Sequence, residues 1–137
     1  MVQSIMVPVD LAHKEQLAAA VAIAVQLAKA DLAKLTLAGV TSSAPSEAAH
    51  NPAEYAEKLA AYAAEISDRA GIPVAAKPLV DVDVAADLGG LLIKAAGDMG
   101  ADLIVMASHV PGFMEHIFAS NAGYVASHAK CSVYVVR

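Results

Sequence analysis

The chain has 137 residues, enough for one domain with a hydrophobic core; 58% of them are hydrophobic, with alanine prominent, and only 4% are aromatic. The formal net charge is −5, from 14 acidic and 9 basic residues without a basic run, which argues against nucleic-acid binding because phosphate neutralisation needs clustered Lys and Arg. The longest apolar stretch, residues 17–25, is too short to cross a bilayer, so the composition also argues against a membrane protein.

In the first half of the chain, short apolar runs alternate with helical patterns. The run Ser4–Val9 is rich in β-branched residues and predicts a buried strand, and the Ala-rich residues 13–30 predict a helix. Lys34–Thr41 predicts a second strand. A helix is expected over residues 52–70, because Asn51 is a typical N-cap, Pro52 is favourable at the first helical position and Gly71 is a usual stop.

The alternation continues beyond the second helix. Residues 73–80 predict a weaker strand, and Pro78 favours a place at the edge of the sheet, because proline cannot donate to a strand ladder. Asp87 is a candidate N-cap for the next helix, and Gly100 is a candidate stop.

The last three predicted elements complete the pattern. Residues 102–107 form the most continuously apolar run and predict a central strand, residues 120–130 predict a helix, and residues 132–137 predict the final strand. Five strands that alternate with four helices predict a single α/β domain over residues 1–137, with a doubly wound parallel sheet and helices on both faces.

The fold class indicates where a ligand would bind. In open α/β sheets, ligands bind beyond the carboxyl ends of strands, where the strand order reverses. If the first and fourth strands are neighbours, Asp10 and residues 106–109 face each other there, and Asp10 is placed to accept a hydrogen bond from a ribose hydroxyl. Residues 119–121 are the expected start of the last helix, where free N–H groups attract phosphate. Alternatively, Asp10, Ser120 and Asn121 serve only as helix caps.

No catalytic or metal site is predicted. His109 is more typical of a loop residue with one hydrogen bond than of a catalytic base. Glu115 and His116 are adjacent in sequence, which is more typical of a solvated face than of a metal site. No Ser/His/Asp set stands in a context that argues for a triad, and the Gly-x-Gly-x-x-Gly and Walker patterns are absent.

Three segments together resemble the universal stress protein family. They are "IMVPVD" near the start, "GADLIVMASH" (residues 100–109) and "HAKCSVYVVR" (residues 128–137), so that the resemblance covers nearly the whole chain. Together with the alternation of elements, it implies a sheet of order 3-2-1-4-5. It further implies a stress-response protein that binds ATP or AMP, with Mg²⁺ if ATP, and that has little or no ATPase activity.

The nucleotide-binding members of this family carry the pattern G-x2-G-x9-G-[ST] after the fourth strand. In this chain the three glycine positions fall on Ala107, Val110 and Ala119, the final position is kept as Ser120, and the second spacing is one residue shorter. The segments "ASHVP" and "ASNA" are similar to a branch of the family that reads A-S-H-R-P and G-S-N-A. Val110 thus stands in place of an arginine, and Ala119 in place of a glycine.

Geometry and resemblance together imply a nucleotide site at the switch point between the first and fourth strands. The alternative function is a nucleotide-free dimeric interaction or regulatory module of the same family. The residues expected at the nucleotide site are Pro8, Val9, Asp10, Val40, Met106, Ala107, His109, Val110, Ala119, Ser120 and Asn121.

The final strand and the single cysteine lead to two further expectations. Ser132–Val136 is a short, mostly apolar strand at one end of the sheet, and soluble proteins pair or cover such an edge. A homodimer through this strand is therefore expected, as the resemblance also implies; the alternative is a monomer whose edge is blunted by Arg137. Cys131 excludes an internal disulfide, and the first ten residues lack a signal-peptide pattern, so we expect a cytoplasmic protein.

Overall fold

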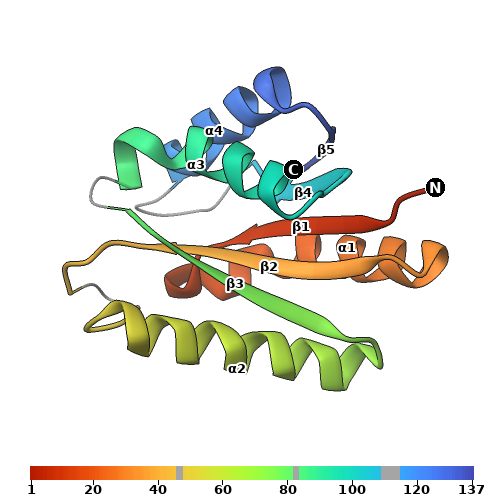
Figure 1. Ribbon diagram of the computed structural model, residues 1–137, viewed down its shortest axis with the longest axis horizontal. Helices are drawn as coiled ribbons and strands as arrows, with labels where there is room; N and C mark the ends of the chain where they lie inside the picture. Colours follow the sequence, from red (N-terminus) through yellow and green to blue (C-terminus); the bar gives the residue numbers. More distant parts are fainter. Residues whose placement is uncertain (46–47, 82–83, 109–114) are drawn as a thin grey trace.

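The computed structural model of the chain describes residues 1–45, 48–81, 84–108 and 115–137. A five-stranded parallel sheet of order β3-β2-β1-β4-β5 forms its centre (Figure 1). This confirms the predicted fold class and strand order. The strands are β1 (Ser4–Val9), β2 (Lys34–Thr41), β3 (Val74–Val80), β4 (Leu103–Ala107) and β5 (Ser132–Val136).

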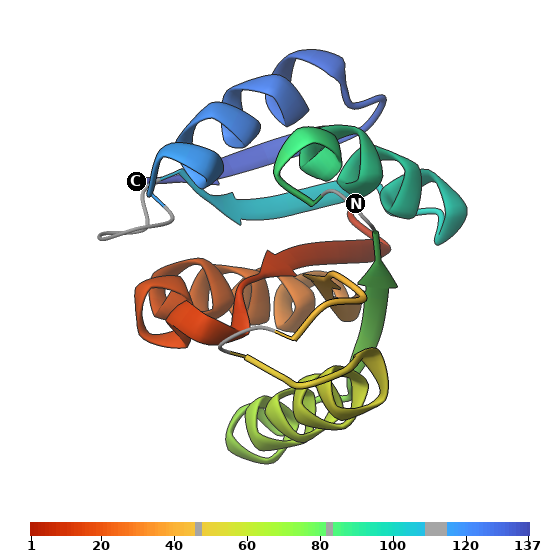
Figure 2. The same ribbon diagram turned by 90° about the vertical axis from the view of Figure 1, so that its left-hand side faces the viewer.

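The helices cover both faces of the sheet. The chain runs outward from β1 to β2 and β3, and then returns to β4 and β5 on the other side of β1. Right-handed crossovers in these two directions place the connecting helices on opposite faces. Figure 2 shows one pair below β1 and the other pair above it. The helices are α1 (Ala18–Asp31) and α2 (Pro52–Ala70) on one face, and α3 (Val84–Asp98) and α4 (Glu115–His128) on the other.

Helix α2 has the ends that the sequence predicts. Asn51 adopts an extended conformation and accepts a 2.8 Å hydrogen bond from the Glu54 backbone N–H, and proline occupies the first turn. At the other end Gly71 has a φ of +74°, a left-handed conformation that glycine adopts without the steric cost of a Cβ. Both ends are thus fixed by local side-chain and backbone chemistry.

Three other helix starts differ from the prediction. A 3-10 segment, η1 (Leu11–Leu17), precedes α1, and His13 within it has non-helical angles (φ −135°, ψ 45°). Helix α3 begins at Val84, so Asp87 lies in its first turn and not at its cap. Helix α4 begins at Glu115, five residues before the predicted start at Ser120. The α-helix α1 itself starts after Leu17, which makes no side-chain capping hydrogen bond.

Helix α1 lies close to the sheet because its inward face consists of small residues. Ala20, Ala24 and Ala28 are buried, and the helix packs on both β1 and β4. Residues 5–9 of β1 and all of β4 are buried as well, so these two strands form the centre of the core. The high alanine content of the chain is therefore explained in part by close helix-on-sheet packing.

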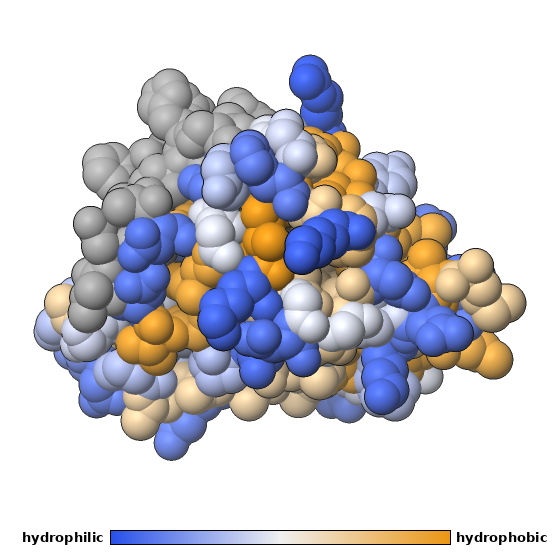
Figure 3. Space-filling model, turned by 45° about the horizontal axis from the view of Figure 1, so that its top comes forward, coloured by the Kyte–Doolittle hydropathy of each residue, from blue (hydrophilic) through white to orange (hydrophobic). Residues whose placement is uncertain are grey.

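The surface on the side of α3 and α4 shows polar and apolar residues interspersed (Figure 3). Tyr124 of α4 and Tyr134 of β5 are among the exposed large hydrophobic residues. No helix within the described residues is long and apolar enough to cross a membrane.

Candidate functional site

The candidate site lies where β1 and β4 end, because the strand order reverses between them. Strand β1 pairs with β2 at all six of its residues, from Ser4 to Val9. Its pairing with β4 covers only two positions, Ile5 with Leu103 and Met6 with Ile104. Beyond these, the carboxyl-terminal residues of β1 and β4 are not paired with each other, and the ladder between the two strands is open at the end where a ligand is expected.

Four of the predicted site residues lie on these strand ends. Pro8 and Val9 end β1, Met106 and Ala107 end β4, and the side chains of all four are buried. Buried apolar side chains form the floor of such a site, while backbone groups and polar neighbours remain to contact a ligand. Val40 of β2 is half-buried and follows Gly39, which is paired with Val9.

Asp10 follows β1 directly and is the acidic group at the mouth of the site. Its Oδ1 accepts a 3.0 Å hydrogen bond from the Ala12 backbone N–H, which makes Asp10 the N-cap of η1. Its Oδ2 lies 3.0 Å from Nδ1 of His13, and the Asp10 side chain is 16% exposed. The capping role that the sequence allowed is therefore present, and the His13 contact is an addition to it.

Tyr55 of α2 lies close to this carboxylate. The residue is 2% exposed, and burial together with the negative charge of Asp10 raises the pKa of the Tyr55 hydroxyl. Within the described part of the chain, this hydroxyl is the buried side-chain polar atom without a hydrogen-bond partner. It packs against Gly39, where a Cβ would overlap it. The ring therefore reaches the sheet at the end of β2 only because residue 39 lacks a side chain.

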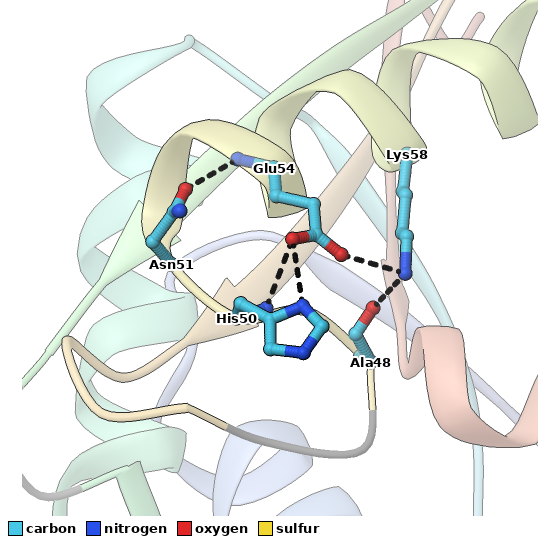
Figure 4. A network of polar contacts seen from close by, with 5 residues as sticks. All are labelled: Ala48, His50, Asn51, Glu54 and Lys58. Carbon is cyan, nitrogen blue, oxygen red and sulfur yellow. Dashed lines mark hydrogen bonds and ion pairs between the residues drawn. The ribbon is translucent and has the colours of Figure 1, made fainter.

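The segment before α2 is attached to the first turn of that helix by a polar network (Figure 4). Glu54 accepts hydrogen bonds from the His50 backbone N–H at 3.3 Å and from Nδ1 of His50 at 3.0 Å. Its other oxygen pairs with Lys58 Nζ at 3.0 Å, and Lys58 also donates to the Ala48 carbonyl at 2.7 Å. Hydrogen bonds from Lys58 and His50 hold the pKa of the Glu54 carboxyl below its usual value. The network fixes how the chain enters α2 after leaving the carboxyl end of β2.

The phosphate side of the predicted site has a different geometry from the one expected. Because α4 begins at Glu115, the backbone of Ala119, Ser120 and Asn121 lies in the second turn of the helix, not at its free N-terminus. The described side chains include Asn121, which borders a crevice with Gly89 and Tyr124, but not Ala119 or Ser120. His109 and Val110 lie outside the described residues.

Neither a cluster of metal-ligating side chains nor the groove between α1 and α2 indicates a second binding site among the described residues. Among the residues that the structure describes, no group of three His, Cys, Asp or Glu side chains is placed to hold a metal ion. A groove between α1 and α2 lies away from the strand ends, and Lys14 on its border sits 5.3 Å from the ring centroid of Tyr62. The Lys14 ammonium group therefore lies near the Tyr62 ring.

Two residues of the site were not predicted from the sequence. The contact of His13 with Asp10 had a local signal, because a histidine three residues after a capping carboxylate is within its reach. Tyr55 had no such signal, since its approach to Asp10 depends on how α2 packs on the sheet. The structure thus adds two neighbours of Asp10: His13, which is close in sequence, and Tyr55, which comes from another element.

The fold defines the class of doubly wound α/β proteins, in which the switch point is the usual place for a ligand. The chain belongs to the universal stress protein family, whose pattern matches residues 1–137. A universal stress protein in complex with cAMP shares 24% identity and a TM-score of 0.71, with 99% of this chain and 97% of that one covered.

Two further solved structures have the same fold. The universal stress protein UspA from Lactobacillus plantarum is 25% identical over 98% of this chain and 97% of its own, with a TM-score of 0.65. The universal stress protein from Archaeoglobus fulgidus in complex with dAMP is 19% identical, with 98% of each chain covered and a TM-score of 0.63. The match extends over nearly the full length of all three relatives.

Proposed function

We propose that this chain is a cytoplasmic stress-response protein that binds an adenine nucleotide, ATP or AMP, at the switch point between β1 and β4, with at most slow hydrolysis. The observation that carries the proposal is Asp10, an acidic acceptor at the end of β1, beside the part of the sheet where β1 and β4 are unpaired. Two relatives of the same fold, crystallised with cAMP and dAMP, support the choice of an adenine nucleotide.

The described residues suggest how the nucleoside half is held. Asp10 accepts a hydrogen bond from a ribose hydroxyl, and the half-buried Val40 lies on the adenosine side. The buried ends of β1 and β4 exclude water beneath the sugar, which strengthens each hydrogen bond made there. Ala107, His109, Val110, Ala119, Ser120 and Asn121 are assigned to the phosphate side, with Mg²⁺ accompanying ATP.

The second candidate function is a nucleotide-free dimeric regulatory module. One observation favours it. The helix start at Glu115 leaves residues 119–121 without free N–H groups. Helix termini bind phosphate through N–H groups that lack an intrahelical acceptor, so their loss weakens the phosphate side.

Mass spectrometry and thermal unfolding distinguish the two functions. Protein purified without added nucleotide is denatured, and the released small molecules are identified; ATP or AMP at near-equimolar amount supports nucleotide binding. ATP with Mg²⁺ at about 100 times its dissociation constant should stabilise the fold by roughly 2.7 kcal/mol. The contrary result is that no nucleotide is released and that ATP raises the melting temperature of neither the parent nor Asp10→Asn. The nucleotide-free module would then remain as the function.

We expect self-association through β5 under both candidate functions. Strand β5 pairs with β4 on one side, and Tyr134 on it is 45% exposed. An edge strand has backbone N–H and C=O groups that a second copy can pair across a two-fold axis. We therefore propose a homodimer centred on Ser132–Val136.

A further inference from the structure

The Asp10 carboxylate is held at both oxygens by groups from its own turn. The Ala12 N–H donates to Oδ1 at 3.0 Å and Nδ1 of His13 lies 3.0 Å from Oδ2. Because a carboxylate only accepts, Nδ1 is the protonated ring nitrogen in this contact. The His13 backbone N–H also donates to the Asp10 carbonyl at 3.0 Å, so that the turn is closed twice. The carboxylate is thereby fixed in one orientation.

A fixed carboxylate retains acceptor capacity. Each oxygen has about two lone-pair positions, so roughly two of the four remain after the Ala12 and His13 contacts. The two adjacent hydroxyls of a ribose offer two donors at a spacing that one carboxylate can accept. Orientation fixed before binding reduces the entropy lost when the sugar is bound.

The other ionisable neighbours do not take over this role. Lys14 follows His13 in sequence but lies over the Tyr62 ring, 5.3 Å from its centroid. Tyr55 packs under Gly39, and its hydroxyl makes no hydrogen bond within the described residues. The His13 side chain is 19% exposed, so solvent competes with its contact only in part. It is the side-chain donor recorded for the Asp10 carboxylate within the described residues.

We infer that His13 is a positioning residue, which orients the Asp10 carboxylate to recognise the two hydroxyls of a ribose. The inference rests on the proposed function, and it adds a determinant of selectivity for ribose over a sugar without hydroxyls. The matching control is His50. Its Nδ1 also lies 3.0 Å from a carboxylate oxygen, that of Glu54, but the side chain is 85% exposed and belongs to the segment before α2.

The test compares the affinities of ATP and 2′,3′-dideoxy-ATP, measured with Mg²⁺ by calorimetry, for parent and variants. His13→Phe keeps a ring but removes the donor, and His13→Asn keeps an N–H donor without the ring. The parent should prefer ATP. His13→Phe should weaken ATP binding about three- to tenfold and leave dideoxy-ATP binding within about twofold, because one positioning hydrogen bond is lost. His13→Asn should restore much of the preference, and His50→Ala should change neither affinity.

The contrary results are distinguishable. A parent that binds neither ligand overturns the proposed function and this inference together. A parent that binds both equally, or a His13→Phe variant that loses both equally or neither, overturns the inference and leaves nucleotide binding in place. Circular dichroism of each variant shows whether it is folded; if His13→Phe is not, His13→Ala replaces it, with the same expected loss.

Discussion

Replacing Gly39 by alanine is expected to destabilise the protein, because the added methyl group has no room between β2 and α2. A Cβ at this position overlaps the Tyr55 hydroxyl oxygen and lies 3.0 Å from Tyr55 Cε1 and 3.1 Å from Leu59 Cδ1. Both neighbours are fully or almost fully buried, so neither can move into solvent. Overpacking of this kind typically costs about 1–3 kcal/mol.

The clash can be separated from other effects of the substitution. Tyr55→Phe removes the oxygen that the new methyl group meets first, and it also removes a buried hydroxyl without a described partner. By itself, Tyr55→Phe should be neutral or slightly stabilising, because no hydrogen bond is lost and a polar group is no longer buried. In the Tyr55→Phe background, Gly39→Ala should cost at least about 1 kcal/mol less than in the parent.

Chemical and thermal unfolding of the four proteins in this cycle measure the coupling. Urea midpoints give the free-energy differences if the slopes agree, and one kcal/mol corresponds to about 3–5 °C in melting temperature for a chain of this size. An equal cost of Gly39→Ala in both backgrounds would refute the assigned clash. A loss of more than about 1 kcal/mol for Tyr55→Phe alone would show that the hydroxyl has a partner.

Four other substitutions test the helix packing, the amino-terminal anchor and the dimer. Gly90→Ala should stabilise α3 by about 0.5–1 kcal/mol, since nothing lies within 4 Å of the new Cβ. Gly89→Ala should lack this gain, because its Cβ would lie 2.5 Å from Tyr124 Cδ1. Thermal unfolding of the two variants measures the difference. Hydrogen bonds from the Ser4 and Gln3 backbone N–H groups lower the pKa of Asp102 in the folded state, so its contribution to stability is present above the unfolded pKa and is lost as the pH falls through the folded one. In urea unfolding, Asp102→Asn should therefore be less stable than the parent at neutral pH and approach it in acid; a constant difference would contradict this. Val135→Lys should shift the sedimentation of a β5 dimer toward the monomer, and a parent that is monomeric at micromolar concentration would refute the dimer.

The sequence predicts the elements that local chemistry specifies. The bounds of β1 and β2 agree with the prediction because apolar, β-branched runs end at polar or turn residues. Helix α2 agrees because Asn51, Pro52 and Gly71 each have a specific backbone role. The place of Asp10 follows from the fold class, since it comes directly after the first strand.

The remaining differences have long-range or competing local causes. Asp and Ser are typical of caps, but Asp87 is also favourable in a first turn, near the positive end of the helix dipole, and gives no unique helix start. Ser120 lies inside a helix that extends further toward its N-terminus than the sequence signal indicates. The contact of Tyr55 with Gly39 joins α2 to β2, and no periodic pattern in the sequence indicates it.

Strands β1 and β4 are hydrogen-bonded to each other near their amino ends but not at their carboxyl ends. At the amino end, Asp102 accepts hydrogen bonds from the Gln3 and Ser4 N–H groups, at 2.9 Å and 3.0 Å, and its own N–H donates to the Ser4 carbonyl at 3.0 Å. Two paired positions follow, and then the ladder between the strands stops.

Helix α1 spans this junction, because it packs on both strands through its alanine face. The strands are thus fixed to each other at one end and on one face, while their carboxyl ends are not paired with each other. A ligand held there by Asp10 and by the end of β4 would add contacts between the two halves of the sheet. Its binding should therefore raise the stability of the whole fold and not only that of the surrounding turns.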